Sequence, residues 1–317
     1  MLETSTRRST CGRPDQRGFT IIELIISMGI LMVISGLMLQ GVVDMSRLNQ
    51  DQSNRSEMHA GIRNATALLQ QEVGQAGRVA FPNAVSLSAA VAGGPNPTWV
   101  TVSSAAGMFV GLRLVIGHGA TQEIVAVTGV NAGANQIQAV FLLPHAIGAR
   151  VGSAGGFGEG VIPTTRANGS TPGVLKIVGD INGDGNMVYV EYTCSWLEGR
   201  LYRNMMPFTA GAKPGVTVEQ VLLDNLLPNP PDPDGTVPPC FSYQQHTISG
   251  RTYVVNVAIM TTVRTHDRHP VTGEFQVVTK ALLNVAPRNV FHTWQMASLG
   301  YANRIQPLPA TVVTLLN

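Results

Sequence analysis

Apolar residues fill positions 19–39 almost without interruption, and Glu23 carries the single charge in this stretch. A run of this length is long enough to cross a bilayer as a helix. Downstream, one apolar stripe recurs every three or four residues, which is the spacing of an amphipathic helix. Its members are Met58, Ile62, Ala65, Leu69 and Val73. The pattern therefore predicts that a single helix continues well beyond the apolar run.

The end of this helix is predicted at Phe81-Pro82, because the residue before a proline is biased away from helical geometry. We therefore expect a helix over residues 19–81, with its membrane-spanning part at about residues 19–43. Such a helix would present its amphipathic second half to a globular domain.

Short alternating segments rich in β-branched residues follow the helix and predict strands. The first group comprises residues 98–102, 113–116, 123–128 and 136–140. We interpret residues 95–153 as an accessory small β-barrel-like module, although the same strands could instead extend one larger sheet. The Gly-rich stretch Gly152 to Gly160 lacks the lysine of a phosphate loop and is interpreted as a linker.

A second β-rich region is predicted over residues 161–317. Residues 174–178 and 187–192 flank a turn, and residues 253–263 and 275–285 form a further hairpin. The predicted fold class is therefore α+β, with a long N-terminal helix packed on an antiparallel β-rich domain that carries an inserted module.

Composition and charge narrow the possible classes. Hydrophobic residues make up 44% and charged residues 13%, with 34 glycines and 19 prolines, which suits a turn-rich exported β protein. A net charge of +2 gives no basic surface, so nucleic-acid binding is not predicted. The arginines that precede the apolar run are Arg7, Arg8, Arg13 and Arg17. The positive-inside rule keeps residues 1–18 in the cytoplasm and sends the C-terminal bulk outward.

Two ordinary explanations of the N-terminus fit poorly. A secretory signal peptide has a shorter apolar core and a small residue at a cleavage site beyond it, whereas Gly18 precedes the run. A plain signal anchor does not account for Glu23, because a carboxylate within a membrane helix is costly and usually functional.

The segment from Arg17 to Leu24, Arg-Gly-Phe-Thr-Ile-Ile-Glu-Leu, resembles the class III signal of type IV pilins and type II secretion pseudopilins. The resemblance implies cleavage between Gly18 and Phe19 by a prepilin peptidase, N-methylation of Phe19, and a role for Glu23 in assembly. It also implies other pilins or pseudopilins and an inner-membrane assembly platform as partners. Physically, the Glu23 carboxylate could neutralise a buried N-terminal amine.

Cys194 and Cys240 are the cysteines that remain once Cys11 leaves with the basic leader. An even pair in an exported chain predicts a disulfide. Two unpaired thiols remain the alternative, because the sequence does not give the distance between their Cα atoms.

An acidic loop matches the spacing D-x-N-x-D-G-x5-E of a calcium-binding loop. The predicted ligands are Asp180, Asn182, Asp184 and Glu191. A strand rather than a helix follows, and Asn-Gly and Asp-Gly also favour hairpin turns. A turn without metal is therefore the alternative.

Three functions remain open. The first is a minor pilin, because residues 287–295 resemble PilW-like minor pilins, incorporated in a type IV pilus and possibly located at its tip. The second is a J-type pseudopilin of a type II secretion system. The third is a membrane-anchored adhesin or ligand-binding module that uses Trp99 and neighbouring aromatic residues. The resemblance places the protein in a bacterial inner membrane and then in a pilus fibre or periplasmic pseudopilus. No catalytic motif is present, so an enzyme is not expected.

Overall fold

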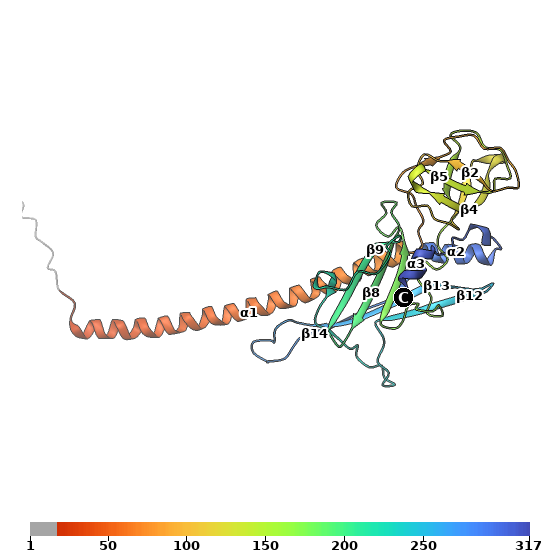
Figure 1. The fold of residues 1–317 in the computed structure, drawn as a ribbon. Helices are drawn as coiled ribbons and strands as arrows, with labels where there is room; N and C mark the ends of the chain where they lie inside the picture. The colour runs from red at the N-terminus through yellow and green to blue at the C-terminus, as the bar shows by residue number, and fades with distance from the viewer. Residues whose placement is uncertain (1–17) are drawn as a thin grey trace, which may run out of the picture. The chain divides into compact units, whose positions relative to one another are not determined.

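The computed structural model describes residues 18–317 and divides into two compact units, the first ending at Ser53 and the second comprising Asn54–Asn317 (Figure 1). The boundary falls within helix α1, Ile21–Gln75, which contributes to both units. The units are described separately below.

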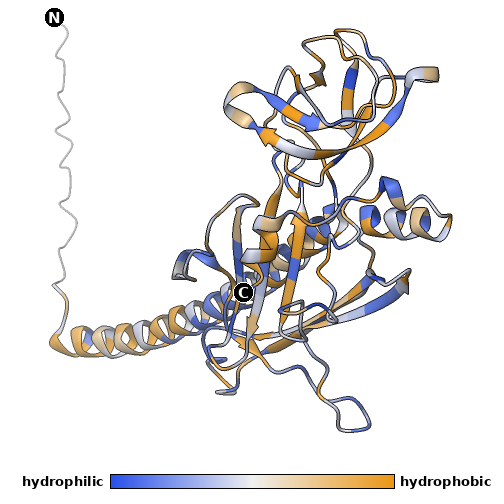
Figure 2. Ribbon diagram, turned by 45° about the vertical axis from the view of Figure 1, so that its right-hand side comes forward, coloured by the Kyte–Doolittle hydropathy of each residue, from blue (hydrophilic) through white to orange (hydrophobic). Residues whose placement is uncertain are grey.

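Helix α1 confirms the long predicted helix. Its first part is apolar and exposed, with Phe19 82% accessible just before it, and Figure 2 shows this part mostly in the hydrophobic colour. By length and composition α1 is able to cross a membrane. It ends at Gln75, before the expected stop at Phe81-Pro82, because Gly77 adopts a φ of +83° and its N–H donates to the carbonyl of Val178 instead.

In the second unit, six strands form a curled antiparallel sheet with the order β1-β6-β3-β4-β5-β2. These strands are β1 (Val85–Ser86), β2 (Thr98–Thr101), β3 (Arg113–Ile116), β4 (Glu123–Asn131), β5 (Gln136–Ala139) and β6 (Arg150–Ser153). A bridge between Leu87 and Val102 joins the chain beside β1 to the chain beside β2, at the opposite ends of the strand order. This curl gives the sheet a small apolar interior, in which Leu114 and Ile137 are fully buried.

Two further antiparallel sheets complete the β structure. One has the order β10-β9-β8-β7, and the other has the order β11-β13-β12 with β14 paired to β13. Their strands are β7 (Val174–Gly179), β8 (Val188–Ser195), β9 (Arg200–Pro207), β10 (Val221–Leu223), β11 (Leu226–Leu227), β12 (Phe241–Ile248), β13 (Arg251–Arg264) and β14 (Val277–Val285). The pairs β7–β8 and β13–β14 confirm the two predicted hairpins.

The helical stripe from Met58 to Val73 is buried in one core cluster with residues of both of these sheets. Strand β7 is covered on both faces. Ile177 belongs to the cluster with α1, whereas Val178 packs with the curled sheet in a second cluster. Burial on both faces explains why apolar residues stand next to each other in β7, as Ile177 and Val178 do, instead of alternating with polar ones.

Four of the six tyrosines in the chain lie on these sheets and have a raised pKa; three of them are buried, and Tyr243 is partly buried. Burial raises the pKa of each of their phenols above the usual value of 10, and for three of them a neighbouring carboxylate adds to the effect. These four tyrosines are Tyr189, Tyr192, Tyr243 and Tyr253.

The Gly152–Gly160 stretch corrects the linker interpretation, because it is packed closely rather than loose. The Gly160 carbonyl accepts from Val178 N–H at 2.8 Å, and Phe157 N–H donates to the Gly77 carbonyl at 2.8 Å. A Cβ on Gly160 would overlap the Cα of Gly77. Glycine is therefore needed here for a close approach of backbones, which composition alone does not distinguish from a flexible linker.

Two C-terminal helices were not predicted. Helix α2 spans Arg288–Ser298 and packs on β13, so the stretch that resembles PilW-like sequences is mostly helical. The short helix α3, Ala310–Leu315, buries Val312 and Leu315 in the cluster shared by β7, β8 and the curled sheet.

Candidate functional site

The start of α1 is a capping box formed by Thr20 and Glu23. The Thr20 N–H and hydroxyl donate to the Glu23 carboxylate at 3.1 and 3.0 Å, and the Glu23 N–H donates to the Thr20 hydroxyl at 3.3 Å. This reciprocal arrangement satisfies two of the N–H groups that a helix start leaves free. In the single chain, Glu23 therefore stabilises the start of the helix to which it belongs.

The residues of the predicted cleavage site are accessible. Gly18 and Phe19 precede α1, and Phe19 is 82% exposed. A Cβ on Gly18 would meet no described atom within 4 Å. Packing against the described residues therefore places no demand for glycine at this position.

A buried charged group joins α1 to the sheet of β8 and β9, and the sequence analysis missed it. Glu72 is 2% exposed, and its carboxylate accepts from Arg203 Nη2 at 2.5 Å and Nε at 3.1 Å. The Tyr192 hydroxyl donates to the same carboxylate at 2.5 Å. One signal in the sequence could have indicated this buried charge. Glu72 lies three residues after Leu69 and directly before Val73, which places a carboxylate beside the apolar stripe.

Electrostatics within this group are consistent with a charged Arg203. Burial lowers its pKa, but the Glu72 carboxylate outweighs burial, and the net pKa is raised. Because the partners come from a helix and two strands, the group fixes the position of α1 along the sheet.

The structure does not bring the four predicted calcium ligands into one group, although the side chain of Asp180 lies near that of Asp184. Asp180 is fully buried and pairs with Arg78, whose Nε lies 3.4 Å from Oδ2. Asn182 and Asp184 are exposed, and the N–H of Asn186 lowers the pKa of Asp184. Within residues 18–317, no group of three or more His, Cys, Asp or Glu side chains is placed to hold a metal.

The fourth predicted ligand, Glu191, is engaged elsewhere. It accepts from the Tyr189 hydroxyl at 2.7 Å and from Lys213 Nζ at 3.0 Å, and Lys176 Nζ lies 3.7 Å away. Its position within β8 directs it to these cations instead of the loop. Calcium binding by the loop thus stays a prediction.

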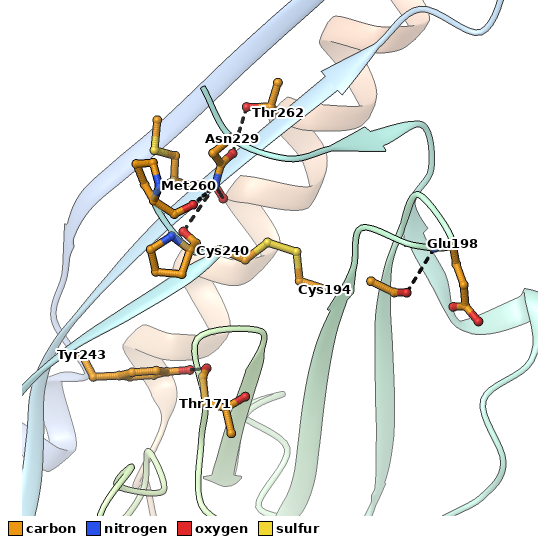
Figure 3. The surroundings of a disulfide bond; sticks show 11 residues. Thr171, Cys194, Glu198, Asn229, Cys240, Tyr243, Met260 and Thr262 are labelled. Carbon is orange, nitrogen blue, oxygen red and sulfur yellow. Dashed lines mark hydrogen bonds between the residues drawn. A yellow bond between two sulfur atoms is a disulfide. The ribbon is translucent and has the colours of Figure 1, made fainter. Parts of the chain in front are cut away.

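The predicted disulfide is confirmed between Cys194 of β8 and Cys240, which precedes β12, with Cα atoms 6.5 Å apart (Figure 3). It links the two four-stranded sheets. Beside it, the Asn229 amide donates to the Pro238 carbonyl at 3.0 Å and to the Met260 carbonyl at 3.1 Å. These bonds hold together the two ends of the Pro-rich loop, residues 228–239, that precedes Cys240.

Trp99, the residue named for the adhesin hypothesis, is 48% exposed on β2, and its ring lies beside Gly129 of β4. It forms no described cluster with other aromatic side chains. The aromatic pairs with exposed members lie instead on α2 and β12, where Trp294 contacts Phe291 and His246.

Comparison with known proteins supports the interpretation of the N-terminus. Residues 13–39 match the family model described as the prokaryotic N-terminal methylation motif, and this range includes Gly18, Phe19 and Glu23. No curated protein matches the chain. The motif implies processing by a prepilin peptidase, anchoring in the inner membrane and assembly with other pilins. The chain is therefore a prepilin-like protein that carries the methylation motif of type IV pilins and pseudopilins.

Proposed function

We propose that the chain is a minor pilin of a type IV pilus, cut between Gly18 and Phe19, methylated on Phe19 and built into the filament through α1. The observation that carries this proposal is the methylation motif at residues 13–39 at the start of a long exposed apolar helix. Exposure of these apolar side chains to water is unfavourable. They therefore need a bilayer before assembly and neighbouring helices in the filament afterwards.

Glu23 carries a carboxylate that could assist the movement of α1 from the bilayer into the filament. After cleavage, Phe19 carries a positive amine next to apolar surface, and a charge buried there needs a partner. The Glu23 carboxylate lies within the first turn of α1 and is already oriented by Thr20. We propose that it neutralises the amine of Phe19, in the same or a neighbouring subunit, as the filament forms.

The cysteine and topology data suit the same pathway. Disulfides form and persist in oxidising compartments, which supports a periplasmic location for the second unit. The arginine-rich residues 1–18 then stay in the cytoplasm, so the membrane is crossed once. Both inferences agree with the side from which a prepilin peptidase would cut.

A minor rather than a major subunit is proposed because of the curled sheet formed by β1 to β6. We interpret residues 95–153 of it as an accessory module that offers surface to an external partner. A subunit with such an addition is accommodated most easily at the tip of a fibre. A type II secretion pseudopilin remains the alternative, and it is excluded if the protein is recovered in surface pili.

The first experiment is mass spectrometry of the N-terminus of the mature protein from its native membrane. A chain that begins with methylated Phe19 is the expected result. An intact leader, or cleavage downstream of residue 39, would refute the proposed processing.

The second experiment separates the two roles of Glu23. Glutamine keeps an oxygen that completes the capping box but has no charge, so Glu23→Gln should retain the start of α1 and its processing. Incorporation into filaments should nevertheless fall at least about tenfold, the effect of one lost interaction of about 1.4 kcal/mol.

Asp44→Asn is the matched control, because Asp44 is an exposed acid on the same helix that pairs with Arg47 at 3.7 Å. It should be incorporated normally. Normal incorporation of Glu23→Gln would show that the charge of Glu23 has no part in assembly.

A further inference from the structure

Two adjoining cavities lie on the second unit where β13 begins. One has a volume of about 210 Å³ and the other of about 240 Å³. Both are lined by Glu159, Arg166 and Arg251, so they form one elongated groove around the same charges. Pro307 and Leu308 supply an apolar wall at one end, and Thr252 lies at the other.

Positive charge exceeds negative charge in this groove. Arg166 pairs with Glu159, the carboxylate that lines both cavities. Arg251 has no carboxylate within 4 Å among residues 18–317 and instead lies against the Tyr253 hydroxyl. Arg113 is close enough to Arg251 that burial and this like charge together lower the pKa of Arg113.

The two arginines are held in place although their charges repel. Both the N–H and the carbonyl of Arg113 bond the Gln306 side chain at 2.7 Å, and its guanidinium donates to the carbonyl of Ala302. The aliphatic part of Arg251 lies over Gly158, where a Cβ would be 3.2 Å from Cδ. An arrangement that keeps like charges together is costly unless an anion completes it.

We propose that this groove binds an acidic peptide segment of another protein, whose carboxylate is held by Arg251 with Arg166 beside it. Guanidinium groups match carboxylates in geometry and bind them through two parallel hydrogen bonds. The elongated groove and its proline and leucine wall favour a stretch of polypeptide over a single small anion. Inorganic phosphate is the competing ligand, since arginine recognises it equally well.

The inference does not depend on incorporation into a pilus, so it can fail while the proposed function stands. The test uses the full-length mature protein in detergent and a fluorescent hexapeptide of alternating glutamate and glycine. Binding is measured by fluorescence anisotropy, with the corresponding lysine and glutamine peptides as comparisons. We expect the glutamate peptide to bind and the other two not to bind.

Replacing Arg251 tests the assignment to the groove. Arg251→Gln should weaken binding of the glutamate peptide about 10- to 100-fold, as expected for loss of charge-assisted hydrogen bonds. Arg251→Lys keeps the charge without the planar fork and should recover part of the affinity. Arg288→Gln, on the exposed start of α2, is the matched control and should bind as the unchanged protein does.

Three results would overturn the proposal. One is absence of binding to the unchanged protein, which needs no variant to interpret. Another is equal binding by Arg251→Gln and Arg288→Gln, which would place the peptide elsewhere. The third is tighter binding of inorganic phosphate than of the peptide, which would make the groove a site for a small anion.

Discussion

Replacement of Arg203 by methionine is the sharpest test of how α1 is held on the β structure. The change removes the guanidinium that donates to Glu72 at 2.5 and 3.1 Å and leaves that carboxylate, 2% exposed, without its cation. Methionine is unbranched and keeps much of the aliphatic contact, so the loss of packing is small. The Tyr192 hydroxyl remains as the one described hydrogen-bond donor to the carboxylate side chain.

The expected cost follows from this burial. Breaking a buried ion pair by removing one partner typically costs about 3–5 kcal/mol, because an uncompensated charge remains. Tyr192→Phe removes one hydrogen bond to a charged group and should cost about 1.5–3 kcal/mol. The double change Glu72→Leu with Arg203→Met removes both charges, so it should cost less than Arg203→Met alone.

Urea unfolding of the full-length protein in detergent, followed by tryptophan fluorescence, provides the measurement. Arg200→Met is a suitable control, because Arg200 is an exposed arginine at the start of the same strand, β9. The reasoning would be refuted if Arg203→Met cost no more than this control. It would also be refuted if the double change were more destabilising than Arg203→Met.

Four further outcomes are expected. Cys194→Ser should lower the free energy of unfolding by up to about 4 kcal/mol, because the bond to Cys240 closes a loop with a sequence separation of 46, and chemical denaturation with and without reductant measures this loss. Gly160→Ala should cost about 3 kcal/mol or more through backbone overlap, whereas Gly94→Ala, with open space around its Cβ, should stay within about 0.5 kcal/mol in thermal unfolding. Tyr189, Tyr192 and Tyr243, whose pKa values are raised most, keep their protons when folded, so stability should be intact below pH 10 and fall above it by about 1.4 kcal/mol per pH unit for each, and absorbance at alkaline pH should show them ionising only on unfolding. Calcium binding by the acidic loop should raise the melting temperature above that in EDTA, even though Glu191 is already bound by Lys213, and no rise would contradict the calcium prediction.

Features set by local pattern could be predicted from the sequence. The apolar run and the stripe from Met58 to Val73 indicated the helix and the face that it buries, because helical periodicity depends on neighbours along the chain. Alternation likewise located β3 and the pairing of β13 with β14. The disulfide was predicted from the even count and the exported context.

Features set by contacts distant in the chain could not be predicted. The pairing of Glu72 with Arg203 joins residues 131 positions apart, and nothing in the local sequence marks Arg203 as its partner. The acidic loop shows how contacts across a sheet bear on a local spacing. Its spacing fits a calcium loop, but Glu191 lies on a strand whose neighbours supply Lys176 and Lys213. The Gly-rich stretch similarly gave the right composition for a linker and concealed a backbone crossing.

That crossing has a consequence for how such a chain can change over evolution. The polypeptide departs from the helix–sheet core at Gly77 and returns at Gly160, and both residues bond Val178. The segment between Gly77 and Gly160 therefore starts and ends at the same place on β7. The entropic cost of closing a loop grows by only about 0.6 kcal/mol for each doubling of its length. Insertions of different size can therefore replace this segment at little cost in loop closure. A replacement would have to shield the face of β7 and β8 that bears Val178 and Tyr189, and also Val312 and Leu315 of α3.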